Sequence, residues 1–263
     1  MTDTRDAETS RRRIAWITGA GSGIGEAAAG ALAEAGFAVV LTGRRADALE
    51  TVAGRIRAGG GEALVQPGDV TRAEDLSRAA STIRDRFGRL DLMVNNAGTN
   101  IADRSFAALT PAGAAQLIDT NLLSGFLGVS AALPLMREAG GGLFIHIASW
   151  AGRHPSPVSG AAYSAAKQGM IMMSHLLNEE ECVNNIRSCV ICPAEVATPI
   201  LDRRPRPVSA EQRGRMLQPA DLGDLVRFIA AQPPHVCVNE VVISPTWNRM
   251  FAAVADAERT GSG

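Results

Sequence analysis

Residues 14–36 read IAWITGAGSGIGEAAAGALAEAG, which joins a short apolar run to a glycine-rich turn and an alanine-rich segment. The turn contains Gly19, Gly21, Gly23 and Gly25. Glycine permits a tight turn and a close approach to a ligand, and the N–H groups at the start of a helix attract phosphate. The order of strand, turn and helix predicts a dinucleotide-binding unit. The spacing Gly19-xxx-Gly23-x-Gly25 differs from the commoner G-x-G-x-x-G fingerprint, and an ordinary flexible loop is the alternative.

Six more short apolar runs follow, and each is separated from the next by a segment long enough for a crossover helix. With the first run, IAWIT at 14–18, the predicted strands are AVVLT at 38–42, ALVQP at 63–67, LDLMVN at 90–95, GLFIHIA at 142–148, IRSCVI at 186–191 and EVVIS at 240–244. Apolar strands that alternate with helices predict a parallel sheet covered on both faces. We therefore expect an α/β fold, a doubly wound and Rossmann-like parallel sheet of about seven strands, with sites beyond the carboxyl ends of the strands.

The length of 263 residues is most economically one domain over 13–250, with loose tails at 1–12 and 251–263. The formal charge of −1 and the pI near 6.4 provide no basic field for nucleic acid, which favours a small neutral or anionic ligand. The N-terminal residues lack an apolar signal region, and no run reaches about 18 apolar residues. These features predict a cytoplasmic protein with no membrane or nucleic-acid partner.

Several side chains that can bind metals are predicted to be structural. Cys189 and Cys192 form a Cys-x-x-Cys pattern inside an apolar run, where a strand turns positions i and i+3 to opposite faces. We predict two buried thiols there, with a metal or redox site as the alternative. His146 lies in another apolar run and is predicted to be a satisfied core histidine. No histidine accompanies the acids Glu179–Glu181 in NEEECVNN, which predicts a solvated helix end and no metal site.

The end of the second predicted strand reads VVLTGRRADALE and places Gly43, Arg44 and Arg45 at the turn. NAD sites usually carry a carboxylate there, which accepts a hydrogen bond from the ribose 2′-hydroxyl. A carboxylate would repel a 2′-phosphate, whereas a guanidinium binds it well. The sequence therefore predicts NADP as the preferred cofactor, with NAD as the second choice. Two solvated arginines that open a helix are the alternative reading.

The stretch AAYSAAKQGM, residues 161–170, holds Tyr163 and Lys167, the single tyrosine and the single lysine of the chain. All the other basic residues are arginine. A spacing of four puts both side chains on one face of a helix. A phenol can give a proton to a developing alkoxide or take one from an alcohol, and a nearby ammonium lowers its pKa from about 10. Arginine is larger and more directional than a compact ammonium, so the pair predicts a proton-transfer site that needs lysine.

With the glycine turn, NNAG at 95–98 and Tyr-xxx-Lys, the sequence resembles the short-chain dehydrogenase/reductase family over about residues 13–250. The resemblance implies a catalytic tetrad of Asn121, Ser149, Tyr163 and Lys167. It also implies a set of cofactor contacts, in which Asp69 and Val70 meet the adenine. The candidate cofactor residues are Gly19, Ser22, Gly23, Ile24, Arg44, Arg45, Asp69, Val70, Asn96, Ala97, Gly98, Tyr163, Lys167, Pro193, Val196 and Thr198.

Two tetrad residues and two residues near them carry expectations of their own. Ser149 follows the fifth predicted strand and would hydrogen-bond the substrate oxygen, with a structural turn serine as the alternative. Asn121 lies in a helical pattern that an amide mildly disfavours. The resemblance implies that it holds a water linking Lys167 to solvent, and a helix-packing amide is the alternative. Trp150 and His154 are the candidate residues of the substrate pocket.

The chain departs from the family pattern in three places. Pro193-Ala194 replaces the usual Pro-Gly, Ala148-Ser149 replaces paired serines, and the last strand, NEVVISPTWN, lacks frequent glycines. The first departure bears on the shape of the nicotinamide pocket, and the last bears on substrate identity and subunit packing. The Pro- and Arg-rich segment 199–217 is a candidate lid.

We expect an NADP-preferring oxidoreductase that interconverts a small carbonyl substrate and an alcohol. Two alternatives remain. The first is a reductase of 3-oxoacyl thioesters, whose acidic carrier would meet the arginines in 203–215. The second is a non-catalytic, cofactor-binding regulatory protein, although such proteins usually lose the tyrosine or the lysine. The apolar-striped segments 110–137 and 163–177 resemble the helices that pair between subunits in the family, which implies a homodimer or homotetramer.

Overall fold

The computed structural model describes residues 12–203, 208–248 and Phe251. Seven parallel strands form one sheet in the order β3-β2-β1-β4-β5-β6-β7. Their bounds are β1 (Ile14–Thr18), β2 (Ala38–Thr42), β3 (Glu62–Val65), β4 (Leu92–Asn95), β5 (Gly142–Ile147), β6 (Ile186–Pro193) and β7 (Glu240–Ile243). The predicted doubly wound α/β fold is confirmed, and each predicted strand is found.

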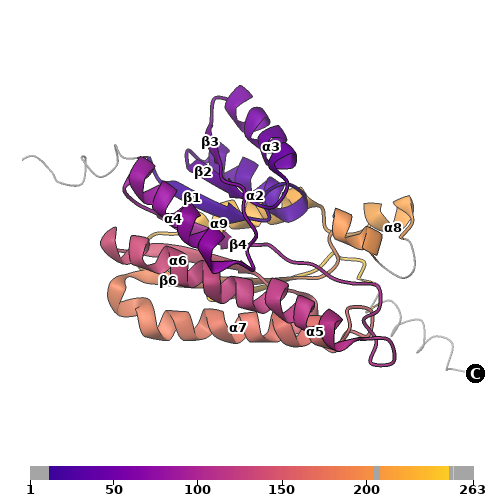
Figure 1. Ribbon diagram of the computed structural model, residues 1–263. Coiled ribbons are helices and arrows are strands. Elements are labelled where there is room, and N and C mark those ends of the chain that lie inside the picture. Colours follow the sequence, from indigo (N-terminus) through magenta and orange to yellow (C-terminus); the bar gives the residue numbers. More distant parts are fainter. Residues whose placement is uncertain (1–11, 204–207, 249–250, 252–263) are drawn as a thin grey trace, which may run out of the picture.

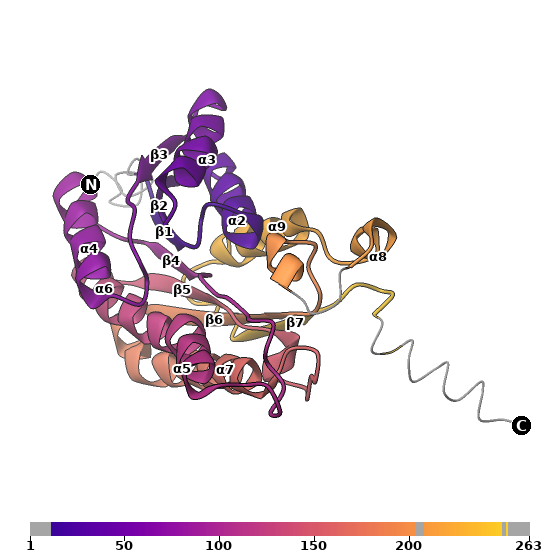
Figure 2. The same cartoon turned by 45° about the vertical axis from the view of Figure 1, so that its right-hand side comes forward.

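Helices cover both faces of the sheet (Figure 1). One face carries α2 (Gly23–Glu34), α3 (Ala46–Ala58) and α9 (Pro219–Ala230), and the other carries α4 (Ala73–Phe87), α6 (Ser124–Glu138) and α7 (Ala161–Glu181). α5 (Pro111–Ile118) and the π-helical turn η1 (Asp119–Leu123) run directly into α6. α8 (Ala210–Gly214) stands apart from both layers (Figure 2). Short 3₁₀ turns are η2 (Trp150–Gly152), η3 (Cys182–Asn184) and η4 (Pro199–Arg203).

The central strands are buried along their whole length, because both of their faces lie under helices. Side chains of one parity, such as Ile17 and Leu41, pack toward α2, α3 and α9. Side chains of the other parity, such as Trp16 and Val40, pack toward α4 and α6. The indole Nε1 of Trp16 donates to Thr42 Oγ1 at 2.8 Å, which satisfies a buried N–H group in the middle of this core.

The direction of the chain across the sheet reverses between β1 and β4. Ile17 on β1 is in register with Leu41 on β2 and with Val94 on β4. The loops that follow β1 and β4 therefore leave neighbouring strands at the same edge and diverge to opposite faces. A crevice at this position is the usual ligand site of a doubly wound sheet. The fold thus brings the glycine turn and the NNAG segment to one place.

The two cysteines of the Cys-x-x-Cys pattern are both buried, as predicted. Cys189 belongs to the core under α2 and α9, whereas Cys192 packs with Met170 of α7 on the opposite face. Burial raises the pKa of each thiol to about 12, so both stay protonated at neutral pH. This arrangement agrees with structural thiols.

The prediction of a solvated acidic helix end is wrong for one of its three residues. Glu179 and Glu180 are exposed, but Glu181 is buried and forms an ion pair with Arg137, whose Nε lies 3.0 Å from Oε2. The hydrogen bond from Arg137 holds the pKa of Glu181 below its ordinary value. The partner comes from α6, so the sequence around Glu181 contains no sign of it.

α5, η1 and α6 form one continuous helical run, Pro111–Glu138, of 28 residues. An 18-residue window within it has a mean hydropathy of 1.2, so the run is long and apolar enough to cross a membrane by length and composition alone. One such helix is a weak indication, because core helices and signal sequences pass the same test. This run packs against α4 and α7. The predicted absence of a membrane partner stays a prediction.

Parts of five sequence predictions lie outside the described residues. These parts are 1–11 of the N-terminal tail, 204–207 of the candidate lid and of the arginines in 203–215, 249–250 of the domain and 252–263 of the C-terminal tail. The strands from Ile14 to Ile243 share one sheet, and a single domain over 13–250 stays a prediction.

Candidate active site

A cavity of about 1130 Å³ lies at the carboxyl ends of the strands. Its lining includes every candidate cofactor residue named above, and also Ser149 and Trp150. Two predicted site residues, Asn121 and His154, do not line it. Sites for drug-sized ligands usually have about 300–1,000 Å³. The larger volume leaves room for a dinucleotide together with a small substrate.

The conformation of the glycine turn lets a ligand approach the main chain of the protein closely. Gly19 and Gly23 adopt φ values of 64° and 60°, in the left-handed region that favours glycine. A Cβ at Gly25 would lie 2.4 Å from the carbonyl oxygen of Gly19, so a larger residue cannot fit there. Ser22, the N-cap of α2, makes no side-chain hydrogen bond to the helix. The first N–H groups of α2 therefore face the cavity without a side-chain cap, as a site for pyrophosphate requires.

The loop after β4 braces this turn. The side-chain Nδ2 of Asn96 donates to the carbonyl oxygens of Thr18 and Gly19, at 2.9 and 3.2 Å. In return, Thr18 Oγ1 accepts from the main-chain N–H groups of Asn96 and Ala97, at 3.1 and 3.2 Å. These four bonds join the ends of β1 and β4 across the switch point. They explain why an amide follows β4 in this chain.

The far end of the cavity is lined by positive charge and by one carboxylate. Arg44 and Arg45 are exposed at the end of β2, and neither forms an ion pair with a residue that the structure describes. Both guanidinium groups are thus available for an anion. Asp69 lies after β3, and its Oδ1 accepts from the main-chain N–H and the hydroxyl of Thr71, at 3.0 and 2.8 Å. These bonds fix the carboxylate at the cavity wall.

α7 presents Tyr163 and Lys167 to the cavity, one turn apart, as their spacing predicts. Lys167 is only 3% exposed, and its Nζ donates to the carbonyl oxygen of Ile147 at 2.8 Å. Nζ also lies 5.8 Å from the centre of the Tyr163 ring. A Cβ added at Gly98 would be 3.5 Å from Nζ, so the NNAG loop closes over the ammonium. Two of the three ammonium donors remain for a ligand hydroxyl and for a relay water.

Burial changes the acidity of two groups beneath the cavity. It lowers the pKa of Lys167 to about 8, so the ammonium form still predominates at neutral pH. It also lowers the pKa of His146 to about 3, with the charge of Lys167 as the smaller cause. His146 is a neutral core histidine whose Nδ1 lies 3.2 Å from Asn95 Nδ2, and this contact assigns the ring proton to Nε2. Nε2 has no hydrogen-bond partner among the described residues. The prediction of a core histidine with satisfied hydrogen bonds is therefore confirmed for one ring nitrogen only.

Asn121 lies in the π-helical turn η1 and is fully buried. Its Oδ1 accepts from the N–H of Thr99 at 3.1 Å, and its Nδ2 donates to the carbonyl oxygens of Thr99 and Leu117, both at 2.9 Å. The side chain therefore holds the loop after NNAG against the helix. π-helical turns interrupt the regular hydrogen-bond ladder and are frequent at functional sites. A relay water at Asn121 stays a prediction.

Ser149 is the N-cap of η2 and lines the cavity. Its Oγ accepts from the N–H of Ala151 at 3.1 Å, which leaves the hydroxyl hydrogen to donate elsewhere. The serine is thus a turn residue and a cavity donor at once. Trp150 also lines the cavity, whereas His154 does not line it and packs against the indole with ring centres 4.3 Å apart.

The replacement of the family's usual glycine by Ala194 needs no strained backbone. Ala194 does not adopt a positive φ, and its N–H donates to the carbonyl oxygen of Ile243 on β7 at 2.8 Å. Pro193, Val196 and Thr198 line the cavity beside it. Thr198 lies 3.1 Å from the position of a Cβ at Gly23, so this loop crosses directly over the glycine turn.

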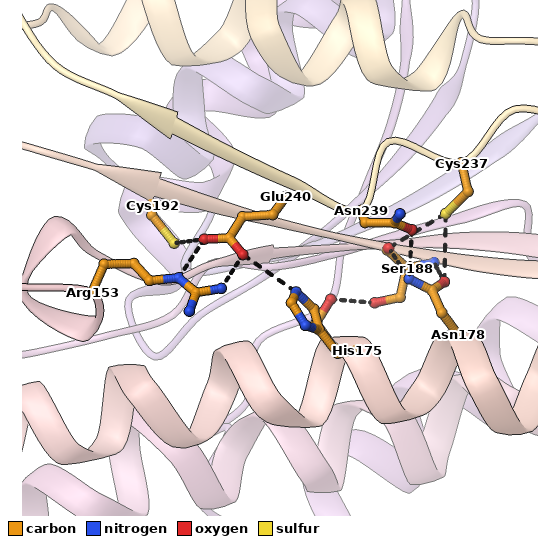
Figure 3. Close-up of polar contacts among 9 residues, drawn as sticks. Arg153, His175, Asn178, Ser188, Cys192, Cys237, Asn239 and Glu240 are labelled. Carbon is orange, nitrogen blue, oxygen red and sulfur yellow. Dashed lines mark hydrogen bonds and ion pairs between the residues drawn. The ribbon is translucent and has the colours of Figure 1, made fainter.

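A polar cluster that the sequence did not reveal joins β6, β7 and α7 to Arg153 (Figure 3). The guanidinium of Arg153, next to η2, binds both carboxylate oxygens of Glu240 on β7, with Nε 2.5 Å from Oε1. His175 of α7 lies 3.3 Å from Oε2, and the thiol of Cys192 donates to Oε1 at 3.8 Å. The hydrogen bond from Arg153 holds the pKa of Glu240 below its ordinary value. Arg153 and Glu240 are 87 residues apart, so no local pattern could predict the pair.

The cluster ties together the elements that carry the candidate catalytic groups. Arg153 closes the turn that begins at Ser149, and His175 belongs to the helix that carries Tyr163. Asn178 adds a second clamp, because its amide accepts from the N–H of Ser188 at 2.6 Å and donates to the carbonyl oxygen of the same residue at 2.7 Å (Figure 3). α7 is thereby fixed along β6.

Comparison with known proteins gives a consistent picture. A family model described as short chain dehydrogenase matches residues 13–208. An uncharacterized oxidoreductase of Staphylococcus haemolyticus is 33% identical over 238 residues, which cover 89% of this chain and 97% of that protein. The alcohol dehydrogenase of the archaeon Thermococcus sibiricus, solved with 5-hydroxy-NADP, is 27% identical with a TM-score of 0.82, over 91% of this chain and 99% of that one. The 3-ketoacyl-(acyl-carrier-protein) reductase of Brucella melitensis, solved with NADH, is 28% identical with a TM-score of 0.80, over 89% and 97%.

The family match covers most of the chain, and the relative and the solved structures extend over nearly all of it. The strand order and the glycine turn at the switch point agree with this match. The chain belongs to the short-chain dehydrogenase/reductase family and is an oxidoreductase of that family.

Proposed function

We propose that the protein is an NADP-preferring oxidoreductase that interconverts a carbonyl compound and an alcohol. The observation that carries this proposal is the buried Lys167 beside Tyr163, on the wall of the same cavity as the glycine turn. Arg44 and Arg45 at the other end favour a cofactor with a 2′-phosphate. The Thermococcus sibiricus enzyme, which was solved with an NADP derivative, supports the cofactor class.

The residues present fit a nicotinamide dinucleotide along the length of the cavity. The glycine turn and the uncapped start of α2 would hold the pyrophosphate, and Asp69 and Val70 would hold the adenine. Asn96, Ala97 and Gly98 would lie beside the adenosine ribose, because they follow the strand next to the turn. Pro193, Val196 and Thr198 would form the wall behind the nicotinamide.

The reaction divides among the four tetrad residues. When bound, NADPH supplies a hydride from C4 of its nicotinamide to the carbonyl carbon. As the new C–H bond forms, the carbonyl π electrons move to oxygen, which takes the proton of the Tyr163 hydroxyl. The hydroxyl of Ser149 donates to the same oxygen and lowers the energy of the developing alkoxide. The Lys167 ammonium stabilises the resulting phenolate, and Asn121 holds the loop that covers Lys167.

A reductase of 3-oxoacyl thioesters is the second candidate. It is favoured by the likeness to the Brucella melitensis reductase and by the arginines of α8 and its surroundings. Arg213 and Arg215 are already engaged by Asp202 and Glu211, which reduces the charge available for an acidic carrier. Turnover of a carrier-bound thioester above that of the free ketone would favour this candidate.

The test of the proposed function is consumption of NADPH with a panel of ketones and aldehydes, followed at the absorbance of the reduced nicotinamide. We expect turnover with at least one member and loss of that turnover in Tyr163→Phe. Tight NADPH binding with no turnover across a broad panel would favour the non-catalytic regulatory reading instead.

The protein is expected to form a dimer or tetramer in solution. Large apolar side chains lie exposed along α6 and α7, among them Phe126 at 48% and Met172 at 54%. Burial of such a stripe removes apolar surface from water at about 25 cal/mol per Å². Light scattering at micromolar concentration should give at least twice the mass of 27.5 kDa. The double variant Phe126→Glu/Met172→Glu should shift the mass toward one chain, whereas Phe106→Glu, at an exposed loop residue, should not. A monomeric unmutated protein would contradict this prediction.

A further inference from the structure

We propose that the substrate carries a flat apolar ring beside its carbonyl-bearing chain, and that Trp150 recognises this ring. The inference rests on the proposed function and specifies the class of its substrate. Trp150 lines the cavity directly after Ser149, the candidate donor to the carbonyl oxygen. A substrate group that extends from the carbonyl toward η2 would meet Trp150.

The main chain beneath the indole cannot shift. Ala151 and Gly152 are buried, and a Cβ at Gly152 would lie 2.9 Å from the carbonyl carbon of Lys167. The N–H of Ala151 is bound to Ser149 Oγ. η2 thus sits directly against the helix turn that carries the lysine. The indole starts from a rigid anchor whose position relative to the reacting groups is set by this packing.

The indole ring itself is held by two other aromatic rings. The imidazole of His154 lies 4.3 Å from it at a tilt of 31°, in a short turn where the His154 N–H donates to the Trp150 carbonyl at 2.9 Å. The ring of Phe251, far away in the chain, meets it edge-on at 5.5 Å and 71°. The edge-on geometry of Phe251 is one that aromatic pairs favour. The three rings form an aromatic wall, in which Trp150 is the ring that lines the cavity.

Several polar groups that line the cavity are engaged within the protein. Asn100 Nδ2 donates to the carbonyl oxygen of Ser159 at 3.0 Å, and Asn100 Oδ1 accepts from the N–H of Ile101 at 2.8 Å. The hydroxyls of Ser156 and Ser159 lie 2.9 Å apart. Because these donors and acceptors are engaged within the protein, they add little attraction for a polar substituent.

Aliphatic side chains line this cavity, beside polar ones such as Gln116, Asp119 and Glu195. Val158, Ile200 and Leu201 line the same cavity, and Leu201 is only 4% exposed. A cleft between an oriented indole and aliphatic side chains favours a flat ring over a puckered one, because only the flat ring can stack on the indole along its whole face. We therefore expect the protein to prefer a substrate with a flat ring over one with a puckered ring when the two substrates have equal size and carbonyl reactivity.

The test uses 4-phenyl-2-butanone and 4-cyclohexyl-2-butanone, whose carbonyl groups are identical because neither ring is conjugated to them. We expect kcat/KM with NADPH to be about 2- to 12-fold higher for the phenyl ketone, the range that aromatic pairs supply beyond area burial. Trp150→Leu should bring the ratio of the two ketones close to one, and Trp150→Phe should keep most of it. His154→Ala should lower the ratio partly, because the indole loses a supporting ring.

Phe106→Leu is the matched control, since it removes a ring that is 87% exposed and does not line the cavity. Its ratio should equal that of the unmutated protein. A ratio at or below one in the unmutated protein, or an unchanged ratio in Trp150→Leu, would overturn the inference. A loss of packing in a variant would lower kcat/KM for both ketones together. The test therefore compares the ratio of the two kcat/KM values and not either value alone.

Calorimetric titration of the same ketones into the NADPH-bound protein separates this inference from the proposed function. Tighter binding of the phenyl ketone, lost in Trp150→Leu, supports the aromatic wall even if no NADPH is consumed, and that result would count against the proposed reaction. Turnover of both ketones with no preference would support the reaction and overturn the aromatic wall. Absence of binding and of turnover would overturn both.

Discussion

Lys167→Arg is expected to lower turnover by about 10²- to 10⁴-fold, although the variant stays folded and binds NADPH. Arginine keeps the positive charge and the helix propensity, so α7 should persist. The site around the ammonium is closed, however. Nζ donates to the carbonyl oxygen of Ile147, and the NNAG loop covers it at Gly98. A planar guanidinium cannot occupy this space without displacing the loop or the Tyr163 ring.

Steady-state kinetics of Lys167→Arg, Tyr163→Phe and the double variant would measure this effect. The double variant should be little worse than the worse single variant, because the two side chains act as a unit. Gln168→Arg is the matched control, since it adds a guanidinium at the next, exposed position of the same helix and should leave turnover unchanged. If Lys167→Arg retains more than about a third of the original turnover while folded and loaded with NADPH, the proposed role of the lysine is wrong.

The pH profile of carbonyl reduction provides a second readout for the same lysine. Because burial lowers the pKa of Lys167 to about 8, the ammonium is present below that pH and is lost above it. The rate of reduction should therefore fall as the pH rises through about 8. In Lys167→Arg the guanidinium does not titrate in this range. The remaining activity of this variant should therefore show no fall in rate near pH 8.

Arg44→Ala is expected to remove most of the preference for NADPH over NADH. A charge-assisted hydrogen bond contributes about 1.5–3 kcal/mol, which is about 10- to 150-fold in affinity. Arg44 lines the cavity at the end of β2 and forms no ion pair with a described residue, so its charge is available to a 2′-phosphate. The effect should appear in NADPH affinity and leave NADH affinity nearly unchanged, since NADH lacks the phosphate.

Calorimetry with both cofactors would measure the change. Arg84→Ala is the matched control, because it removes the same charge from α4, outside the cavity lining, and should leave both affinities as they were. Arg45→Ala should have a smaller effect of the same sign if the two guanidinium groups share the phosphate. Equal or reversed affinities for the two cofactors in the unmutated protein would contradict the predicted preference.

The strands and the local motifs were readable from the sequence, because each depends on residues that are close together in the chain. A parallel strand between two helical layers is apolar on both faces, and this property makes IAWIT and AVVLT visible as strands. The positive φ of Gly19 and Gly23 likewise follows from the glycine turn. The shared cavity face of Tyr163 and Lys167 follows from their spacing of four in a helix.

The contacts that position the site were decided only by the tertiary structure, because they join residues far apart in the chain. Glu240 meets Arg153 across 87 residues, and Glu181 is buried against Arg137 across 44. Phe251 reaches Trp150 in the same way. A side chain's neighbours across a fold depend on how helices and strands pack, and chain-local patterns carry no information about that packing. The sequence therefore determined the strands and the tyrosine–lysine pair, and the packing of α7, β7 and η2 determined how those groups are held.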